Sequence, residues 1–427
     1  MKNWAGNLEY GARAVASPAS LEELCAVVAR SPRVKALGSR HSFNSIADTD
    51  GIHLRLDRLA VPPAIDSGRN VVRVSGATSY GDLSGHLAAR GFALANLASL
   101  PHISVAGAIQ TGTHGSGVAN QGLASAVRAV DIVRASGEME RLEALDGEAF
   151  DGGLVALGAL GIVTDLELAI EPSYEMSQEV FENLPWDTAL EHFGQIAAAG
   201  YSVSLFTDYR GDTISQVWLK KRSPDGTGTD RRGCPGAESQ RVGDFFGASA
   251  APAQRHPLPD MSAANCTQQL GIPGPWLDRL PHFRNDFAPS SGEELQSEYL
   301  LPIGSAAGAL QALRGLADRL APALYISEIR TVAADGLWLS PAYGRDSVAM
   351  HLTWKPLPDL VGELLPLVED RLAPFGARPH WGKLFGTGGA RPAELYPRFP
   401  DFRALVSTHD PGGKFTNTFL GGVLGSG

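Results

Sequence analysis

Five long strand-like segments between residues 174 and 385 constrain the fold more than any other feature of the sequence. Each is rich in β-branched and aromatic side chains and is bounded by residues that favour turns, as β-strands are. Amphipathic segments at 305–320 and 360–372 carry helical periodicity. This pattern indicates an antiparallel sheet backed by helices, an α+β arrangement. The five segments are 201–208, 216–222, 295–302, 324–332 and 347–355.

The first 173 residues have a different character, with short strands and many glycines. A helix is expected to begin after Ser20, because Glu23 stands three residues later and completes a capping box. A short apolar strand at 34–37 follows and ends at Gly38. The region lacks the regular alternation of strands and helices that builds a doubly wound parallel sheet.

The 427 residues are enough for two or three domains, and changes in composition suggest where they divide. We expect a first region at 1–173, a second at 174–385 and a tail at 386–427 that again contains short strands. Residues 222–265 are rich in Gly, Pro and Ser and have little periodicity, which predicts a long loop or a partly disordered insert.

Charge and cysteine content narrow the class of protein. The net charge is −10, whereas a nucleic-acid partner would require a basic face that neutralises phosphates. The three cysteines are an odd number and form no CxxC pair, so we expect neither a disulfide nor a cysteine metal site. They are Cys25, Cys234 and Cys266.

Nothing in the sequence suggests a membrane partner. The first ten residues contain no apolar segment of the signal-peptide type, and the longest nearly apolar run, 154–163, is too short to span a bilayer. We therefore expect a cytoplasmic protein. The absence of a long amphipathic seam favours a monomer.

Residues 97–117 form the first chemically suggestive segment, because four glycines fall among their last eleven positions. Closely spaced glycines expose backbone N–H groups in a concave nest that suits a pyrophosphate. Composition alone, however, favours a plain glycine-rich turn between strands. The chain carries no Rossmann fingerprint, Walker A motif, HExxH or GxSxG sequence. The four glycines are Gly107, Gly112, Gly115 and Gly117.

Polar residues of several kinds recur in the strands of the second region. Glu328 and Arg330 are two apart and share one strand face, as do His351 and Thr353. If the two strands are neighbours, one sheet face carries all four side chains, with His380 and Lys383 following nearby. A solvated sheet face would explain any one pair. The combination of an acid, cations, imidazoles and a hydroxyl instead suits a polyhydroxylated ligand.

Together these segments resemble the vanillyl-alcohol-oxidase-like flavoproteins, and within them the alditol oxidases, which act on xylitol or sorbitol. The resemblance runs almost from end to end and spares the segment near 222–260. It implies a two-part FAD-binding domain of the PCMH type, formed by 1–173 and 386–427, with a substrate-binding cap domain at 174–385. The matching stretches are NWAGN (3–7), GSRHSF (38–43), 97–117, LGALGIVT (157–164), EIRTVAAD (328–335), LSPAYGRD (339–346), HLTW (351–354), RPHWGK (378–383) and GKFTN (413–417).

The resemblance also implies how the cofactor is held. In proteins with the GxxHS motif, the histidine bonds covalently to the 8α-methyl group of FAD, which makes His41 the expected attachment point. Arg40 stands where some relatives carry glycine. The remaining residues expected to contact FAD are Leu37, Gly38, Ser39, Arg40, Ser42, Ser99, Ser104, Gly107, Thr111, Gly112, Thr113, His114, Ile162, Val163 and His380.

The reaction implied by the resemblance is oxidation of a terminal alditol hydroxyl to the aldose. A hydride would pass to flavin N5, and O₂ would reoxidise the flavin and leave as H₂O₂. The residues expected to bind substrate are Ser99, Glu328, Arg330, Thr353 and Lys383. Those expected to take part in catalysis are Lys383, Arg330, Glu328 and His351.

Two other functions are compatible with the same residues. An aldonolactone oxidase or dehydrogenase of the same superfamily would share His41 and the FAD-binding segments but would act on a lactone. A carbohydrate-binding protein without redox chemistry would use the same polar sheet face. Covalently bound flavin colour in the acid-denatured protein would distinguish an oxidase from a binding protein.

Overall fold

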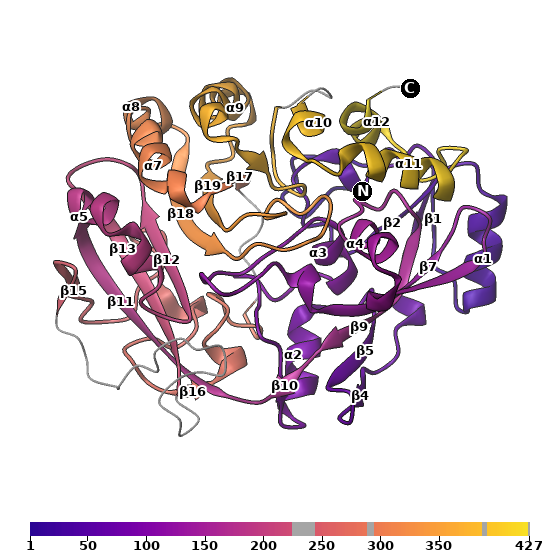
Figure 1. Cartoon of the computed structure of the whole chain (residues 1–427), viewed down its shortest axis with the longest axis horizontal. Coiled ribbons are helices and arrows are strands. Elements are labelled where there is room, and N and C mark those ends of the chain that lie inside the picture. The colour runs from indigo at the N-terminus through magenta and orange to yellow at the C-terminus, as the bar shows by residue number, and fades with distance from the viewer. Residues whose placement is uncertain (224–243, 288–293, 387–390, 426–427) are drawn as a thin grey trace.

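The ten-stranded antiparallel sheet that occupies one half of the molecule carries the candidate site on one of its faces (Figure 1). The computed structural model describes residues 1–223, 244–287, 294–386 and 391–425. The strand order is β14, β15, β11, β13, β12, β18, β19, β17 and β20, and β16 pairs with β11. These strands are β11 (Glu175–Pro185), β12 (Ser202–Thr207), β13 (Thr213–Arg222), β14 (Asp244–Phe245), β15 (Ala248–Ala250), β16 (Gly274–Pro275), β17 (Leu295–Pro302), β18 (Leu324–Val332), β19 (Ser347–Trp354) and β20 (Arg378–Pro379).

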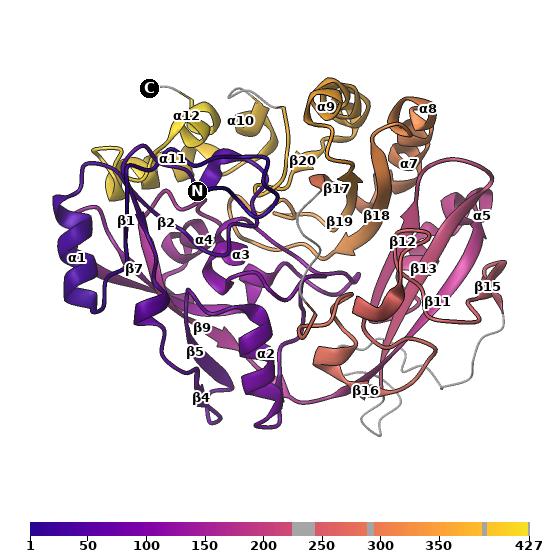
Figure 2. The same ribbon diagram turned by 180° about the vertical axis from the view of Figure 1, so that it is seen from behind.

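Helices cover the outer face of this sheet, as the sequence predicted. Figures 1 and 2 show α5, α7, α8 and α9 along the outer side of the sheet. Leu310 of α7 and Leu364 of α9 share a buried apolar cluster with Ile329 and Met350 of the central strands. Ile329 therefore faces the helices, while its neighbours in β18 point to the opposite face. The helices are α5 (Trp186–Glu191), α6 (Phe193–Ala197), α7 (Ala306–Arg314), α8 (Ala317–Leu320) and α9 (Pro358–Leu372).

The other half of the molecule contains two larger sheets and a short pair of strands. One sheet is five-stranded and antiparallel in the order β4, β5, β9, β7, β8, and the other is three-stranded and parallel in the order β1, β3, β2. β6 (Phe92–Ala93) pairs with β10 (Glu171–Pro172). The strands of the larger sheets are β1 (Ala14–Ala16), β2 (Val34–Ala36), β3 (Ile52–Leu54), β4 (Ala64–Asp66), β5 (Val71–Ser75), β7 (Val127–Val133), β8 (Met139–Glu143) and β9 (Ile162–Ala169).

Helices of this half include the one expected after Ser20. Ser20 is the N-cap of α1 (Leu21–Arg30) and its side chain accepts a hydrogen bond from the backbone N–H of Glu23. The Glu23 carboxylate returns to the backbone N–H of Ala19, at 2.8 Å, so the start of the helix is capped from both sides. The other helices here are α2 (Tyr80–Ala88), α3 (Val105–Gln110) and α4 (Glu148–Leu154).

The C-terminal tail packs against the N-terminal half, and its conformation differs from the prediction. We expected short strands in 386–427, but the described part of this tail forms three helices. Buried Phe402 and Leu420 belong to the same apolar cluster as residues of the five-stranded sheet, so burial of one helix face outweighs local strand preference. The helices are α10 (Arg391–Leu395), α11 (Phe399–His409) and α12 (Thr418–Leu424).

Two further expectations are only partly correct. The segment 97–117, interpreted as a glycine-rich loop, contains the short helix α3, because Ser104 begins a helical turn that buries Val105, Ala108 and Ile109. The expected insert at 222–265 begins inside β13 and includes β14 and β15, while residues 224–243 lie outside the described residues.

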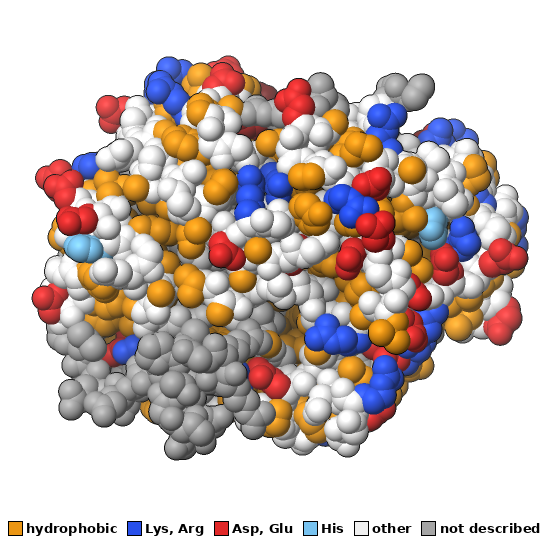
Figure 3. All heavy atoms as spheres, viewed as in Figure 1, with side chains coloured by type: hydrophobic (Ala, Val, Ile, Leu, Met, Phe, Trp, Pro, Cys, Tyr) orange, Lys and Arg blue, Asp and Glu red, His pale blue; other side chains and the backbone are white. Residues whose placement is uncertain are grey.

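Both described cysteines, Cys25 and Cys266, are free thiols, and Cys234 lies outside the described residues. No helix in the described ranges is long and apolar enough to cross a membrane. Figure 3 shows basic and acidic side chains interspersed over the visible face. The division of the chain at 173 and 385 into domains stays a prediction.

Candidate active site

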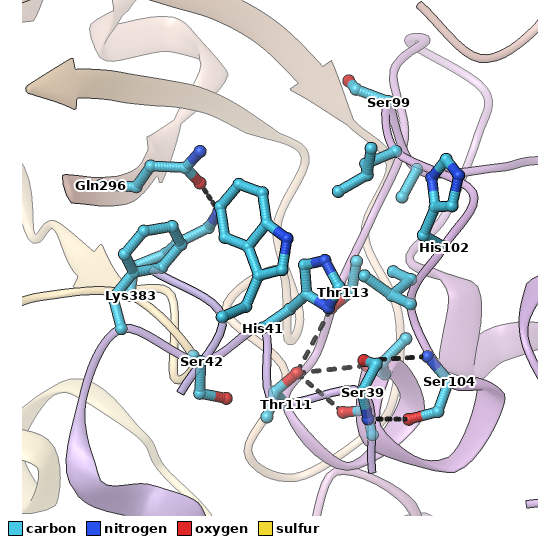
Figure 4. A pocket seen from close by; sticks show the side chains of 18 of the residues that line it. Ser39, His41, Ser42, Ser99, His102, Ser104, Thr111, Thr113, Gln296 and Lys383 are labelled. Carbon is cyan, nitrogen blue, oxygen red and sulfur yellow. Dashed lines mark hydrogen bonds between the residues drawn. The ribbon is translucent and has the colours of Figure 1, made fainter. Parts of the chain in front are cut away.

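A cavity of about 570 Å³ lies between the two halves of the molecule. One side, here called the N-terminal wall, is formed by residues 38–43 and by most residues of the segment 98–114. The opposite side, here called the sheet wall, consists of side chains from β17, β18 and β19 together with residues 380–383. Figure 4 shows His41 in the cavity, with Lys383 and Gln296 on one side of it and Ser39, Ser104 and Thr111 on the other.

The loop that carries His41 is fixed by the N-terminal segment of the chain. Asn3 Nδ2 donates a hydrogen bond to the backbone oxygen of Ser42 at 2.9 Å. The ring of Trp4 stacks on the His41 imidazole with the ring centroids 4.9 Å apart. These contacts explain why the NWAGN sequence accompanies the GSRHSF sequence, because the first orders the loop that presents the histidine.

The same loop is joined to the sheet wall. Asn44 Nδ2 donates to the backbone oxygens of Trp381 and Lys383 at 2.8 and 2.7 Å. The backbone N–H of Phe43 donates to the backbone oxygen of Gly382 at 2.8 Å. His41 and Lys383, which are far apart in sequence, are therefore held in a fixed relation by hydrogen bonds from Asn44 and Phe43 to backbone oxygens.

The His41 ring is suited to bond to a carbon electrophile. Both ring nitrogens are buried, no side chain of the described residues bonds to them, and the ring interacts only weakly with the backbone of Ser39. Burial, assisted by the positive charge of Lys383, lowers the pKa of His41 to about 4. The imidazole is therefore neutral at physiological pH and has a free lone pair, as covalent attachment of a flavin methyl group requires. These residues fit the expected cofactor.

The floor of the N-terminal wall is formed by hydroxyls and closely packed backbone. Ser39 and Ser104 exchange hydrogen bonds, with the Ser104 N–H donating to Ser39 Oγ at 3.2 Å and the Ser39 N–H donating to Ser104 Oγ at 3.4 Å. A Cβ atom at Gly38 would lie only 2.5 Å from Ser104 Oγ. A side chain at position 38 would displace the Ser104 hydroxyl, so glycine at this position preserves the exchange between Ser104 and Ser39.

Most residues expected to contact FAD line the cavity. Gly112 and Ile162 do not. A Cβ at Gly112 would point toward Pro341, and Ile162 is buried in a separate apolar cluster because neighbouring residues of β9 alternate between faces. The contacts expected for these two residues stay unsupported. The expected residues that line the cavity are Leu37, Gly38, Ser39, Arg40, His41, Ser42, Ser99, Ser104, Gly107, Thr111, Thr113, His114, Val163 and His380.

Strand pairing produces the polar face expected on the sheet wall. Glu328 of β18 lies opposite His351 of β19, which in turn lies opposite Glu298 of β17. Thr353 and Arg330 line the cavity with them. The expected substrate-binding and catalytic residues are thus together in one cavity, including Ser99 from the N-terminal wall and Lys383.

A buried carboxylate at the centre of this wall pairs with Arg330 and lies close to two imidazoles. Glu298 Oε1 is 2.5 Å from an Arg330 guanidinium nitrogen and 3.3 Å from His114 Nε2, and Glu298 Oε2 is 3.4 Å from His351 Nδ1. Burial alone would raise the pKa of Glu298, but Arg330 and the two imidazoles outweigh it and hold the pKa well below its usual range. Glu298 therefore remains ionised and compensates the charge of Arg330.

Lys383 is the cation of the sheet wall that has the weakest carboxylate contact. Its Nζ contacts Gln296 Oε1 and lies 4.9 Å from the centroid of the Phe43 ring. Burial lowers the pKa of Lys383 to about 8, although Glu298 opposes the shift. An ammonium group without a paired carboxylate can interact with a ligand oxygen.

Sequence reasoning missed three residues of this site, namely Glu298, Gln296 and His282. Glu298 and Gln296 are two apart in a segment recognised as a strand, and the alternation rule applied to β18 and β19 would have placed them on the same face. His282 lies 2.7 Å from Glu328 but comes from an irregular loop, so no local pattern indicates it.

Comparison with known proteins supports a flavoprotein. Residues 12–143 match the family described as FAD binding domain, and residues 293–423 match the family described as D-arabinono-1,4-lactone oxidase. The solved structure of cholesterol oxidase from B. sterolicum superimposes with a TM-score of 0.75, at 14% identity over 99% of this chain and 96% of that one. At this identity the likeness establishes the fold alone, which combines the FAD-binding domain matched by residues 12–143 with a large antiparallel sheet.

Two curated proteins are similar to this chain over nearly its full length. An L-gulono-1,4-lactone dehydrogenase of Mycobacterium tuberculosis is 27% identical over 99% of this chain and 98% of its own length. An alditol oxidase of a Streptomyces species is 49% identical over 99% of this chain and 98% of its own length. With this identity, the match to the FAD-binding family and a cavity that fits the flavin, the chain belongs to the FAD-dependent alditol oxidases.

Proposed function

We propose that this protein oxidises the terminal hydroxyl of alditols such as xylitol and sorbitol to the aldose, with O₂ as electron acceptor and H₂O₂ as product. The observation that carries the proposal is the pairing of two unlike walls around one cavity. A neutral histidine whose ring nitrogens bond to no side chain of the described residues faces a charged, buried sheet surface that offers donors and acceptors for hydroxyl groups.

FAD, when bound, supplies the two-electron chemistry that no side chain can perform. We propose that it is attached through its 8α-methyl carbon to His41. Trp4 stacks on the imidazole and orders it, and the neighbouring hydroxyls of Ser39 and Ser104 hold the backbone in the conformation that admits a large planar group.

Lys383 and Arg330 polarise the reacting hydroxyl. Both are cations in a largely buried site, where they stabilise the negative charge that develops on oxygen as the hydroxyl loses its proton. Arg330 Nη1 is also 3.4 Å from Ser99 Oγ, which links the sheet wall to the N-terminal wall. Glu328, Thr353 and Ser99 would bind the adjacent hydroxyls of the substrate, since a carboxylate and two hydroxyls can satisfy donors and acceptors alike.

His351 is the residue that we assign as proton acceptor. Burial lowers its pKa, so the imidazole is neutral, and the Glu298 carboxylate 3.4 Å from Nδ1 would stabilise the cation that forms. His380 is less suited, because its Nδ1 accepts a hydrogen bond from the backbone N–H of Gly382 at 3.1 Å. A neutral His380 must then carry its proton on Nε2 and acts as a donor.

Substrate preference can be tested with the purified holoprotein. Oxygen uptake and H₂O₂ formation would be measured with xylitol, sorbitol and L-gulono-1,4-lactone under the same conditions. The proposal predicts a much higher kcat/KM for an alditol than for the lactone. Faster oxidation of the lactone would instead establish the aldonolactone oxidase alternative.

Covalent attachment can be tested separately. Intact mass spectrometry of the holoprotein should show the polypeptide plus one FAD, and acid precipitation should leave a yellow pellet. His41→Ala should lose both signals, whereas the control His102→Ala, at another histidine lining the cavity, should retain them. A wild-type mass equal to that of the polypeptide alone would exclude the covalent bond.

We further propose that the protein is a cytoplasmic monomer. Cell fractionation would test its location, and light scattering would test its oligomeric state.

A further inference from the structure

Behind Glu328 lies a buried chain of side chains that the proposed reaction does not use. Lys220 of β13 and His282 of the 276–287 loop are both buried, with exposed fractions of 1% and 5%. The Nζ atom of Lys220 lies 3.0 Å from His282 Nδ1, and His282 Nε2 lies 2.7 Å from Glu328 Oε1. The three side chains form a continuous series in which His282 and Glu328 both line the cavity and Lys220 lies behind them.

Burial lowers the pKa of Lys220 to about 7, although Glu328 opposes the shift, so Lys220 is an ammonium group below that pH. With Lys220 charged, this row of three side chains permits only one arrangement of protons. An ammonium group has three N–H donors and no acceptor. Two of them are directed to the backbone oxygens of Leu280 and Pro281, at 2.6 and 3.1 Å. The third is directed to His282 Nδ1, which must therefore be an acceptor with a free lone pair. The proton of a neutral His282 is then on Nε2, from which it donates to the Glu328 carboxylate.

The surroundings hold the imidazole in place. Phe206 and Trp218 contact the His282 ring edge-on, with centroids 5.7 and 5.0 Å away. The backbone N–H groups of His282 and Phe283 donate to the backbone oxygen of Ser99, at 3.2 and 3.3 Å. The loop that carries His282 is thus joined to the N-terminal wall as well as to the sheet wall, and the ring has little freedom to rotate.

This arrangement fixes Glu328 from behind. Oε1 receives the His282 hydrogen bond and is also 3.7 Å from Arg330 Nε, while Oε2 receives no hydrogen bond from the described residues. Burial alone would raise the pKa of Glu328, but Arg330 and His282 outweigh it and lower the pKa. An ionised carboxylate with one oxygen occupied presents the other as an acceptor for a substrate hydroxyl.

We propose that Lys220 and His282 are positioning residues for alditol oxidation, which act by fixing the His282 tautomer and thereby the orientation of the Glu328 carboxylate. The proposal deepens the function proposed above and rests on it. Neither residue needs to contact the reacting carbon, so the expected effect is on substrate binding rather than on the chemical step. Loss of uniform binding raises KM while kcat changes little.

The kinetic test uses the intact holoenzyme with xylitol. His282→Leu and Lys220→Met should each raise KM at least tenfold with kcat within about threefold of the wild type, the pattern of lost uniform binding. His282→Gln, which retains an acceptor and a donor, should recover most of the loss. His409→Leu and Lys355→Met are matched controls, since His409 is buried elsewhere and Lys355 also donates to two backbone oxygens without touching a histidine.

A double-mutant cycle separates positioning from a structural role. In a Glu328→Gln background, His282→Leu should change KM by less than about twofold, because both changes act through the same carboxylate. Effects on KM that multiply independently, or a His282→Leu enzyme with an unchanged KM, would overturn the proposal. Flavin absorbance and melting temperature of each variant would identify any loss due to misfolding.

A spectroscopic test does not depend on the substrate. ¹⁵N spectra of histidine-labelled wild-type holoenzyme would be recorded between the pKa values of His282 and Lys220, about 4 and about 7. The His282 signal, identified by its absence in His282→Gln, should show a neutral ring protonated on Nε2. Lys220→Met should change this signal. A wild-type ring protonated on Nδ1 would overturn the proposal even if xylitol were a good substrate. If no alditol were oxidised, the proposed function would fail while this measurement still decided the tautomer.

Discussion

The two walls of the cavity differ in the kinds of side chain that line them. The N-terminal wall is mostly hydroxyls, glycines and imidazoles, with Arg40 as its basic side chain, and contacts such as the exchange between Ser39 and Ser104 involve uncharged groups. The sheet wall carries ionised Glu298, Glu328 and Arg330 within a few ångströms of one another. The first wall is thus suited to enclose a large cofactor by shape, and the second to bind and polarise hydroxyl groups by charge.

This difference predicts which kind of substitution should destabilise each wall. A wall made of backbone shape depends on conformations that only some residues adopt easily. A wall made of buried charges depends on complete compensation, because an unpaired buried charge costs several kcal/mol. Substitutions should therefore have large electrostatic effects on the sheet wall and smaller conformational effects on the N-terminal wall.

The largest effect, on the free energy of unfolding, is expected for Glu298→Gln. Removing this carboxylate leaves the buried Arg330 without its closest partner, which we expect to lower the free energy of unfolding by roughly 3 to 5 kcal/mol. Chemical denaturation of the variant would measure the loss. Ser39→Ala on the N-terminal wall should cost only about 1 kcal/mol, as one neutral hydrogen bond does. Equal losses in the two variants would contradict the comparison.

A somewhat smaller effect, on the reaction rather than on stability, is expected for Lys383→Met. Loss of one preorganised donor raises a reaction barrier by about 3 kcal/mol, so kcat with xylitol should fall by more than about a hundredfold. Flavin content should be unchanged, since His41 is intact. Steady-state kinetics and the visible spectrum would measure both. Undiminished turnover would remove Lys383 from the proposed mechanism.

The pH dependence of turnover should reveal the charge on the same lysine. The pKa of Lys383 is lowered to about 8 by burial, so the ammonium form is present below pH 8 and is lost above it. If the ammonium stabilises alkoxide charge, kcat should fall by up to about tenfold per pH unit above that pKa. Lys383→Arg should remove this decline. An increase in kcat through pH 8 would mean that the neutral amine acts as a base.

The smallest effect is expected on the N-terminal wall, for Arg40→Gly. Arg40 has a φ of 64°, in the left-handed region that favours glycine, which gives a physical reason why some relatives carry glycine before the histidine. The substitution should raise the free energy of unfolding by up to about 1 kcal/mol, because strain is relieved but the unfolded chain gains freedom. Thermal denaturation would measure it, and a marked loss of stability would show that the arginine side chain matters more.

Strand periodicity predicted much of the sheet wall. Alternation placed Glu328 and Arg330 on one face, and the same rule applied to 295–302 would have found Glu298. It could not predict His282, which reaches Glu328 from a loop 46 residues earlier in the chain. Nor could it predict helix α3 in the glycine-rich segment or the helices of the tail, because burial against distant residues determines both.

By itself the sequence determined the main strands of the large sheet, the residue types of the site and the family, since hydrophobic periodicity and long matching motifs are properties of neighbouring positions. Only the tertiary structure determined which charged side chains pair with one another. The pairing of Arg330 with Glu298 and the chain from Lys220 through His282 to Glu328 each join segments tens of residues apart. Their energies depend on burial and on distances of about 3 Å, which arise when strands and loops pack and which no local pattern encodes.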